Sequence, residues 1–422
     1  MTLVFLLQAS QFTTSPEVPE QEGLFSDSAP LKVTLLGSEW GSSAGGLSTL
    51  NRELAIHLSL HPKVKVSLLV PEGACNDEDK REVDEKYGIT VVDAKKRPGY
   101  DRLDWLSFPP EDLSMNIVVG HGKKLGKQGQ VIRDVKSSCK WVQVVHTAPE
   151  DLAKYKGYSE PITEGEKKHE VEIELCKLAD LVVPVGPKLK EDYCSFLRRY
   201  EKDLDILAIT PGLFEREFGD LEQSPNESSD FKVLLCCRGD DEDFELKGCD
   251  IAAKAFAVEQ LKGKRFHLVF VGAPDGKQNE IMEKLLRCGI AKDQLTVRGF
   301  IQREKMKDLL CEVDLAIMPS KTEGFGLVAL EALSAGLPIL VGGNSGFARA
   351  LENILFGESC IVDSNEPTKW AEAIGAVRDK HGKRLEEIKV LRKAYKEKYS
   401  WERQCEVLVE KMWTMVHGTG SI

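Results

Sequence analysis

The sequence lacks the features that mark several protein classes. No apolar run approaches the ~20 residues that a membrane-spanning helix needs. The formal net charge is −11, so no excess of positive charge favours nucleic acid or an anionic membrane as a partner. Hydrophobic residues make up 42% of the chain and charged residues 30%, which excludes a wholly disordered protein. We therefore expect a globular protein with no nucleic acid partner and no integral membrane segment.

The cysteines lack a regular spacing. There are 11 of them, scattered singly apart from Cys236-Cys237, and none form a C-x2-C pair. This irregular, odd set favours reduced thiols over a disulfide framework. The apolar segment 2–7 lacks the basic start and the small-residue cleavage site of a secretory signal. We expect a cytoplasmic protein.

Signatures of metals and resident cofactors are also missing. The glycine-rich segment 37–46 is not G-x-G-x-x-G, so a dinucleotide cofactor is not expected. His169-Glu170 does not continue into the H-E-x-x-H zinc motif. Asp241 and Asp243 have D-x-D spacing, but a solvated acidic loop explains them more simply. We expect neither a metal nor a bound cofactor.

The chain is organised as two series of alternating strand-like and helical segments. Residues 1–30 are rich in Ser, Thr, Pro, Gln and Glu and are expected to form a flexible arm. From Leu31 onward, short apolar runs alternate with amphipathic stretches, such as the helix expected from Gly45 to Leu60. This alternation predicts a parallel sheet. The strands expected in the first series are 31–36, 64–70, 116–119, 141–145 and 181–185.

A break without periodicity separates the two series. Glu, Ser, Pro and Asn crowd together there, so residues 215–230 are the expected linker between domains 31–214 and 231–400. The strands expected in the second series are 232–236, 267–271, 295–298, 315–318 and 338–341. Helices are expected from Thr368 onward, with the last one in the C-terminal segment 401–422.

The most informative stretch is Glu323-Gly-Phe-Gly-Leu-Val-Ala-Leu-Glu331. It follows a short apolar strand, and Gly324 and Gly326 allow a sharp turn into a helix. The free N–H groups at the start of such a helix suit a diphosphate. Glu331 is a carboxylate within a helix that is apolar nearly all round, so it needs a polar partner. A pair of ribose hydroxyls would serve.

This stretch resembles the E-x7-E motif of the retaining glycosyltransferases with the GT-B fold, in particular group 1 (family 4), and the similarity covers roughly residues 31–415. The resemblance implies an α/β protein with two Rossmann-like parallel-sheet domains facing a cleft, and a C-terminal helix that crosses back to the N-terminal domain. It also implies that Glu323 contacts hydroxyls of the donor sugar, that Glu331 binds the ribose, and that backbone N–H groups around Phe325, Gly326 and Leu327 hold the phosphates.

Three other places join the candidate site through the same resemblance. Gly45 and Gly46 could simply shape a turn, but the family places this loop over the donor phosphates. His146 follows a strand and resembles the family's strand-end histidine that contacts the donor sugar. Arg238 and Lys247 resemble the two cations that neutralise the departing diphosphate. The loop between these cations is longer and more acidic than is usual in the family, so the diphosphate geometry stays open.

Further features carry weaker expectations. The acidic helix start at 164–174 reads as a solvated face, although Glu170 and Glu174 could line an acceptor pocket. The segments 210–212 and 342–346 depart from the family pattern, which could alter donor choice or weaken activity.

We therefore expect a metal-independent glycosyltransferase that uses a nucleoside-diphosphate-sugar donor, with a UDP-sugar favoured. It would transfer the sugar, with retention of configuration, to a hydroxyl of a small molecule or glycan. The alternative is a catalytically weak nucleotide-sugar-binding or regulatory module of the same fold. A phosphorylase is disfavoured because no lysine-bearing pyridoxal-phosphate motif is evident. The sequence does not determine the base, the sugar, the acceptor or the oligomeric state.

Overall fold

The computed structural model describes residues 29–41, 45–155, 161–198, 205–225, 230–261 and 265–418. The expected N-terminal arm therefore lies almost entirely outside the described residues. Residues 226–229 of the expected linker and residues 419–422 also lie outside them.

The N-terminal domain is built on a six-stranded parallel sheet with strand order β3-β2-β1-β4-β5-β6. Its strands are β1 Leu31–Leu36, β2 Val64–Pro71, β3 Thr90–Ala94, β4 Ile117–His121, β5 Lys140–Val145 and β6 Leu181–Pro184. Its helices are α1 Gly46–Ser59, α2 Asp77–Tyr87, η1 Arg102–Ser107, α3 Gly122–Val135, α4 Pro149–Ala153, α5 Pro161–Leu178 and α6 Gly186–Leu197. Each strand expected from the sequence is present, and β3 is an additional edge strand.

The C-terminal domain repeats this design, with strand order β12-β11-β10-β7-β8-β9. Its strands are β7 Phe231–Cys236, β8 Phe266–Ala273, β9 Leu295–Gly299, β10 Leu315–Met318, β11 Ile339–Gly342 and β12 Ile361–Val362. Its helical segments are α8 Cys249–Ala257, α9 Gln278–Arg287, η2 Lys292–Gln294, η3 Arg303–Lys305, α10 Met306–Glu312, α11 Leu327–Ser334, α12 Gly346–Leu351, η4 Glu358–Cys360 and α13 Pro367–Asp379. The expected fold class, two Rossmann-like domains, is confirmed.

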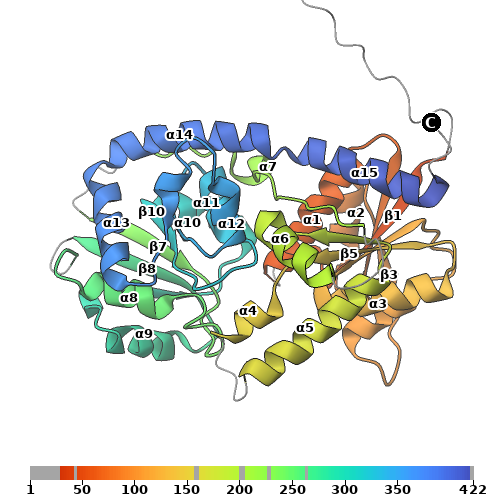
Figure 1. Cartoon of the computed structure of the whole chain (residues 1–422), viewed down its shortest axis with the longest axis horizontal. Coiled ribbons are helices and arrows are strands. Elements are labelled where there is room, and N and C mark those ends of the chain that lie inside the picture. Colours follow the sequence, from red (N-terminus) through yellow and green to blue (C-terminus); the bar gives the residue numbers. More distant parts are fainter. Residues whose placement is uncertain are drawn as a thin grey trace, which may run out of the picture.

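The apolar strands are buried because helices cover both faces of each sheet, as Figure 1 shows. All residues of β4, β6, β10 and β11 are buried. Such continuous burial is typical of parallel sheets and explains why these strands read as unbroken apolar runs. In the part of the chain that the structure describes, no helix is long and apolar enough to cross a membrane.

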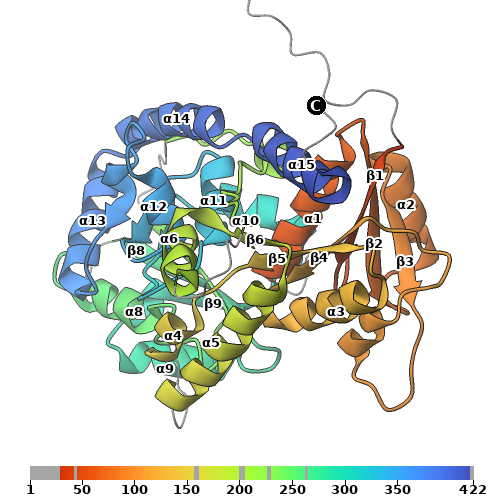
Figure 2. The same ribbon diagram turned by 45° about the vertical axis from the view of Figure 1, so that its right-hand side comes forward.

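Two segments connect the domains. The first begins with the short helix α7 Glu215–Phe218, at the start of the expected linker. Phe214 and Phe218 are each only 1% exposed, so this part of the linker is packed rather than solvated. The second consists of helices α14 His381–Lys398 and α15 Trp401–His417, which run across both domains in Figures 1 and 2. Helix α15 packs against α1, and the Trp401 ring stacks on His57 with 5.1 Å between centroids.

The segment 210–212, which departs from the family pattern, is held by this second connection. The Gln404 side chain accepts a hydrogen bond from the Thr210 N–H and donates one to the Thr210 carbonyl, both at 2.7 Å. A Cβ atom at Gly212 would lie 2.7 Å from the Trp401 ring, so only glycine permits this close approach. The departure therefore lies at the domain junction.

Candidate active site

A cleft of about 1130 Å³ lies at the carboxyl ends of the strands of both sheets. Open α/β sheets present their ligand groups at this edge. All of the site residues predicted from the sequence line this cleft: Gly45, Gly46, His146, Arg238, Lys247, Glu323, Phe325, Gly326, Leu327 and Glu331. The structure thus brings together residues from five separate places in the chain, while their individual roles stay predictions.

The Glu323–Glu331 motif forms the turn and helix that the sequence predicts. Gly326 has φ 110° and immediately precedes α11, so a side chain there would be strained. A Cβ atom at Gly324 would collide with the carbonyl oxygen of His146 in the other domain. Glycine therefore allows the motif to approach the N-terminal domain closely. Backbone N–H groups of the motif can then face whatever fills the cleft.

The departure at 342–346 lies directly against this motif. The Glu323 N–H donates to the Asn344 carbonyl at 3.1 Å, and the Gly346 N–H donates to the Glu323 carbonyl at 3.3 Å. The Ser345 hydroxyl accepts from the Ala348 N–H and so caps α12. The altered residues thus support the backbone of Glu323.

Lys247 and Glu323 form an ion pair with 2.5 Å between Nζ and Oε2. Burial opposes the charged form of Lys247, but the Glu323 carboxylate outweighs it and raises the pKa of Lys247 above its ordinary value. Lys247 therefore remains a cation in the cleft. A sugar hydroxyl that binds Glu323 would lie beside this ammonium group.

Arg238 is the more exposed of the two predicted cations, with 63% of its side chain accessible. It lies 3.9 Å from Asp240 and 4.0 Å from Asp243, which are loose ion pairs. A Cβ atom at Gly45 would lie 3.9 Å from Arg238 Nη2, so the glycine loop of the N-terminal domain reaches this cation. The guanidinium group is thus accessible to a phosphate.

The acidic loop between these cations is only partly solvated, contrary to expectation. Asp241 is exposed and pairs with Lys284. Asp243 is 7% exposed and lines the cleft, because the adjacent Phe244 side chain is buried and draws the loop inward. No group of three or more His, Cys, Asp or Glu side chains in the described residues could hold a metal ion.

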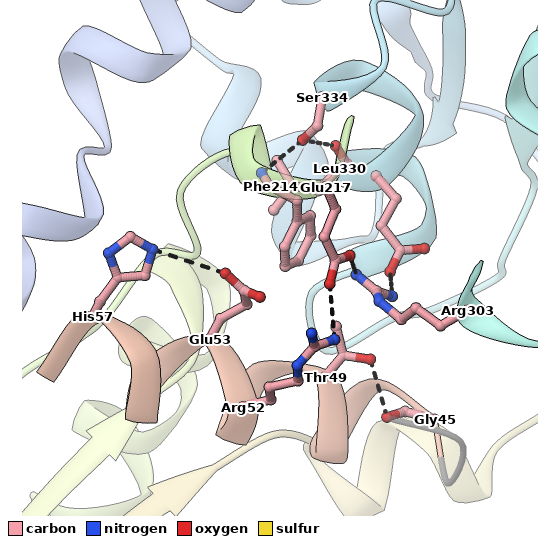
Figure 3. Close-up of polar contacts among 11 residues, drawn as sticks. Gly45, Thr49, Arg52, Glu53, His57, Phe214, Glu217, Arg303, Leu330 and Ser334 are labelled. Atoms are coloured by element: carbon pink, nitrogen blue, oxygen red, sulfur yellow. Dashed lines mark hydrogen bonds and ion pairs between the residues drawn. The ribbon is translucent and has the colours of Figure 1, made fainter. Parts of the chain in front are cut away.

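Glu331 has a protein partner that the sequence did not reveal. Its carboxylate pairs with Arg303, which also pairs with Glu217 of α7, and Glu217 accepts a 2.8 Å bond from Arg52 of α1. Figure 3 shows how Arg52, Glu217 and Arg303 converge from both domains. Burial raises the pKa of Glu331, and Arg303 opposes this effect. The predicted ribose-binding carboxylate is therefore part of an interdomain network of charges.

His146 makes a 2.9 Å contact from its Nε2 to Nδ1 of His121 at the end of β4. Burial lowers the pKa of His146 to about 4, and burial together with His146 lowers that of His121 well below its usual value. Both rings are therefore neutral at pH 7, and one proton lies between them. His121 was not among the residues predicted from the sequence, although it ends β4, the strand next to the one that His146 follows.

The N-terminal half of the cleft contains Glu172, not Glu170 or Glu174. These last two are exposed, as expected for a solvated face, and the alternative that they line an acceptor pocket is wrong. Glu172 is 4% exposed, and its burial raises its pKa to about 7. The spacing Gly165, His169, Glu172, Cys176 and Ala179 follows one helical face, a periodicity that could have identified the buried glutamate.

Three lysines lie near the start of α3 in the same half: Lys123, Lys124 and Lys127. Their ammonium groups make no ion pair or hydrogen bond within the described residues. Cations near a helix N-terminus are unfavourable for the helix dipole. These lysines therefore contribute little to the stability of α3, and they are available to a ligand.

Two Rossmann-like domains that face a cleft, with cations and a helix N-terminus on one side, define the GT-B class of glycosyltransferases. Solved structures agree on the fold. Sucrose-phosphate synthase from Thermosynechococcus elongatus superposes with a TM-score of 0.65 at 17% identity, over 91% of this chain and 99% of that one. HepE from Anabaena, solved in complex with UDP and glucose, gives a TM-score of 0.66 at 16% identity over 91% and 100%.

Sequence comparison then identifies the family. The model described as "Family 4 Glycosyltransferase in conflict systems" matches residues 34–408, so this chain belongs to the family 4 glycosyltransferases. D-inositol 3-phosphate glycosyltransferase of Paenarthrobacter aurescens is 27% identical over 51% of each chain. The same enzyme of Rhodococcus erythropolis is 24% identical over 87% of this chain and 86% of that one. For the first of these relatives, the matched part spans about half of the protein.

Proposed function

We propose that this glycosyltransferase moves a sugar from a UDP-sugar to an acceptor hydroxyl, with retention of configuration and without a metal ion. The observation that carries the proposal is the convergence of Arg238, Lys247 and the start of α11 at one side of the cleft. Fixed cations and backbone N–H groups stabilise the charge that develops on a departing diphosphate. The UDP and UDP-glucose complexes of HepE, a structural neighbour, support the uridine nucleotide.

The acceptor binds in the N-terminal half and carries a negative charge. The free ammonium groups of Lys123, Lys124 and Lys127 support this proposal, because they would neutralise a phosphate or carboxylate. Relatives of this chain are named for inositol 3-phosphate and neighbours for phosphorylated sugars, which is consistent with such an acceptor. The buried amide oxygen of Gln128, which lacks a partner among the described residues, could accept a bond from an acceptor hydroxyl.

The neutral His146 contacts the donor sugar in this proposal. A neutral imidazole can donate or accept a hydrogen bond without adding charge beside the diphosphate. Retention itself rests on the resemblance to the retaining class. A cytoplasmic location is supported by the cysteines, all of which are free thiols.

The test combines binding and turnover. Calorimetry with UDP, followed by transfer from UDP-sugars to phosphorylated polyols in EDTA, should show binding, turnover without metal, and an NMR signal for the retained anomer. Glu331→Ala should weaken UDP binding, whereas His146→Ala should lower kcat with UDP affinity nearly intact. If wild type binds UDP but neither transfers nor hydrolyses any sugar conjugate, the alternative of a nucleotide-sugar-binding module replaces the enzyme.

A further inference from the structure

In the charge network around Glu331, each paired carboxylate oxygen contacts a different nitrogen atom. One oxygen of Glu331, Oε1, pairs with Nη1 of Arg303, and Nη2 of Arg303 pairs with Oε2 of Glu217. The other oxygen of Glu217 accepts from Arg52. Within the described residues, Oε2 of Glu331 makes no hydrogen bond or ion pair. Arg303 thus occupies half of the Glu331 carboxylate and leaves the other half open to the cleft.

Arg303 is held in this position by the connection between the domains. Its guanidinium carbon lies 5.5 Å from the ring centroids of both Phe214 and Phe218, which flank Glu217. Cations are attracted to aromatic faces at such distances. The side chain of Arg303 is 11% exposed and that of Glu331 is 6% exposed, so water screens this network only weakly. The segment 214–218 therefore fixes which side of Arg303 meets Glu331.

We propose that Glu217, a residue of the domain connection, positions Arg303 so that Glu331 keeps one oxygen for the ribose of the donor. The inference rests on the proposed function, because it needs a nucleotide in the cleft. Without Glu217, Arg303 could take both oxygens of Glu331 in the bidentate geometry that guanidinium and carboxylate groups favour. Glu217 is therefore a positioning residue for nucleotide recognition, and it links that recognition to α7.

Removing Arg52 should have the opposite effect on nucleotide binding to removing Glu217. Arg52 occupies the second oxygen of Glu217, and neither residue is among those that line the cleft in the described structure. If Arg52 is removed, Glu217 can accept both nitrogens of Arg303 and draw it away from Glu331. Replacing Arg52 and replacing Glu217 should therefore change the affinity for the nucleotide in opposite directions. A purely structural network would give one direction for both.

The experiment compares UDP with 2′,3′-dideoxy-UDP by calorimetry. Wild type should prefer UDP by about tenfold or more, as expected for bonds to a charged carboxylate. Glu217→Gln should weaken UDP binding by about tenfold and bring the ratio of the two dissociation constants toward one. Arg52→Gln should bind UDP at least as tightly as wild type and keep the preference. Glu217→Asp, which keeps the charge with a shorter reach, should be intermediate and serves if the glutamine variant does not fold.

Glu215→Gln is the matched control. Glu215 lies on the same helix α7, but it pairs with Lys396 at 2.8 Å, outside the network. This variant should leave both dissociation constants unchanged. Equal weakening by Glu217→Gln and Arg52→Gln, or an unchanged preference for ribose in Glu217→Gln, would overturn the inference. A wild type that binds UDP without preferring ribose would overturn it too, while the proposed function would stand. A wild type that binds no nucleoside diphosphate would refute the proposed function itself.

Discussion

The two halves of the cleft differ in how their charges are compensated. In the C-terminal half, Lys247 pairs with Glu323 and Arg303 pairs with Glu331. In the N-terminal half, no cation lies within ion-pair distance of Glu172 in the described residues, although Lys123 interacts with it at longer range. The ammonium groups of Lys124 and Lys127 make no ion pair in the described residues. The charges of the C-terminal half are thus paired before a ligand arrives, whereas the N-terminal half keeps ammonium groups without an ion pair in the described residues. Preorganised charges favour catalysis because they need not reorient during reaction.

The largest expected effect concerns Glu172 and pH. Its folded-state pKa of about 7 is above the unfolded value of 4.5, so folding favours the protonated form. Stability should be greatest below about pH 4.5 with respect to this group, and should fall as the pH rises through 7. Glu172→Gln should remove this fall, a gain of roughly 3 kcal/mol over wild type at pH 8. Urea unfolding at pH 5 and pH 8 measures it.

The control for that measurement is Glu174→Gln, since Glu174 lies on the same helix and is exposed. It should not change the pH dependence. Glu53, buried beside His57, also has a pKa raised to about 7 by burial and by Glu217, so wild type should keep part of the decline in either variant. If the free energy of unfolding changed equally with pH in Glu172→Gln and wild type, Glu172 would ionise normally. The two halves of the cleft would then not differ in how their charges are compensated.

The next largest effect is expected from removing a cation of the C-terminal half of the cleft. Lys247→Ala should weaken UDP binding by roughly 1.5–3 kcal/mol, about ten- to 150-fold, because a charge-assisted contact to the diphosphate is lost. Arg238→Ala should have an effect in the same range. Lys284→Ala, which removes the pairs with Asp241 and Glu280 outside the cleft, is the matched control. Unchanged UDP affinity in both site variants would mean that the acidic loop has removed these cations from the site.

A smaller effect is expected at the histidine pair. Replacing His121 with Phe removes one hydrogen bond to His146 but retains an aromatic ring, and should lower kcat by up to about tenfold. The KM for the donor should hardly change, because His121 acts through the orientation of His146 rather than through nucleotide binding. A matching rise in KM, with kcat intact, would place His121 in donor binding instead.

The smallest effect is expected from removing a lysine of the N-terminal half of the cleft. Lys124→Ala should raise the KM for an anionic acceptor a few-fold, as for one exposed charge contact, and leave the KM for the donor unchanged. The effect should shrink at high salt, because exposed charges are screened. If a neutral polyol is used equally well by wild type and variant, the acceptor carries no charge that this lysine recognises.

The sequence predicted the C-terminal half of the cleft more fully than the N-terminal half, for a physical reason. Glu323, Gly326 and Glu331 lie within one turn and the helix that follows it. Their spacing in the sequence is therefore enough to predict their relative positions. His121 contacts His146 only because strands β4 and β5 are neighbours, and Glu172 reaches the same cleft only through the packing of α5. No local sequence pattern encodes either arrangement. Strand β12, with two residues, is too short to produce a periodic signal.

Arg303 shows a second limit of local reasoning. It lies in a one-turn helix, η3, and nothing near it in the sequence indicates a carboxylate partner. Its partners Glu217 and Glu331 are 86 and 28 residues away along the chain. The expected linker also concealed α7, because two buried phenylalanines within a polar stretch do not form a periodic pattern. Long-range ion pairs must be observed in the structure.

The C-terminal helix has a consequence for how the protein is made. Because α15 packs on α1 and the Trp401 ring stacks on His57, the N-terminal domain is completed by residues that are translated after the second domain. The first Rossmann-like sheet can form during synthesis, but one side of α1 stays uncovered until the whole second domain has been translated. A chain cut short before Trp401 would therefore retain both sheets while exposing an apolar face of α1. Such a truncated chain would expose apolar surface that the longer chain buries.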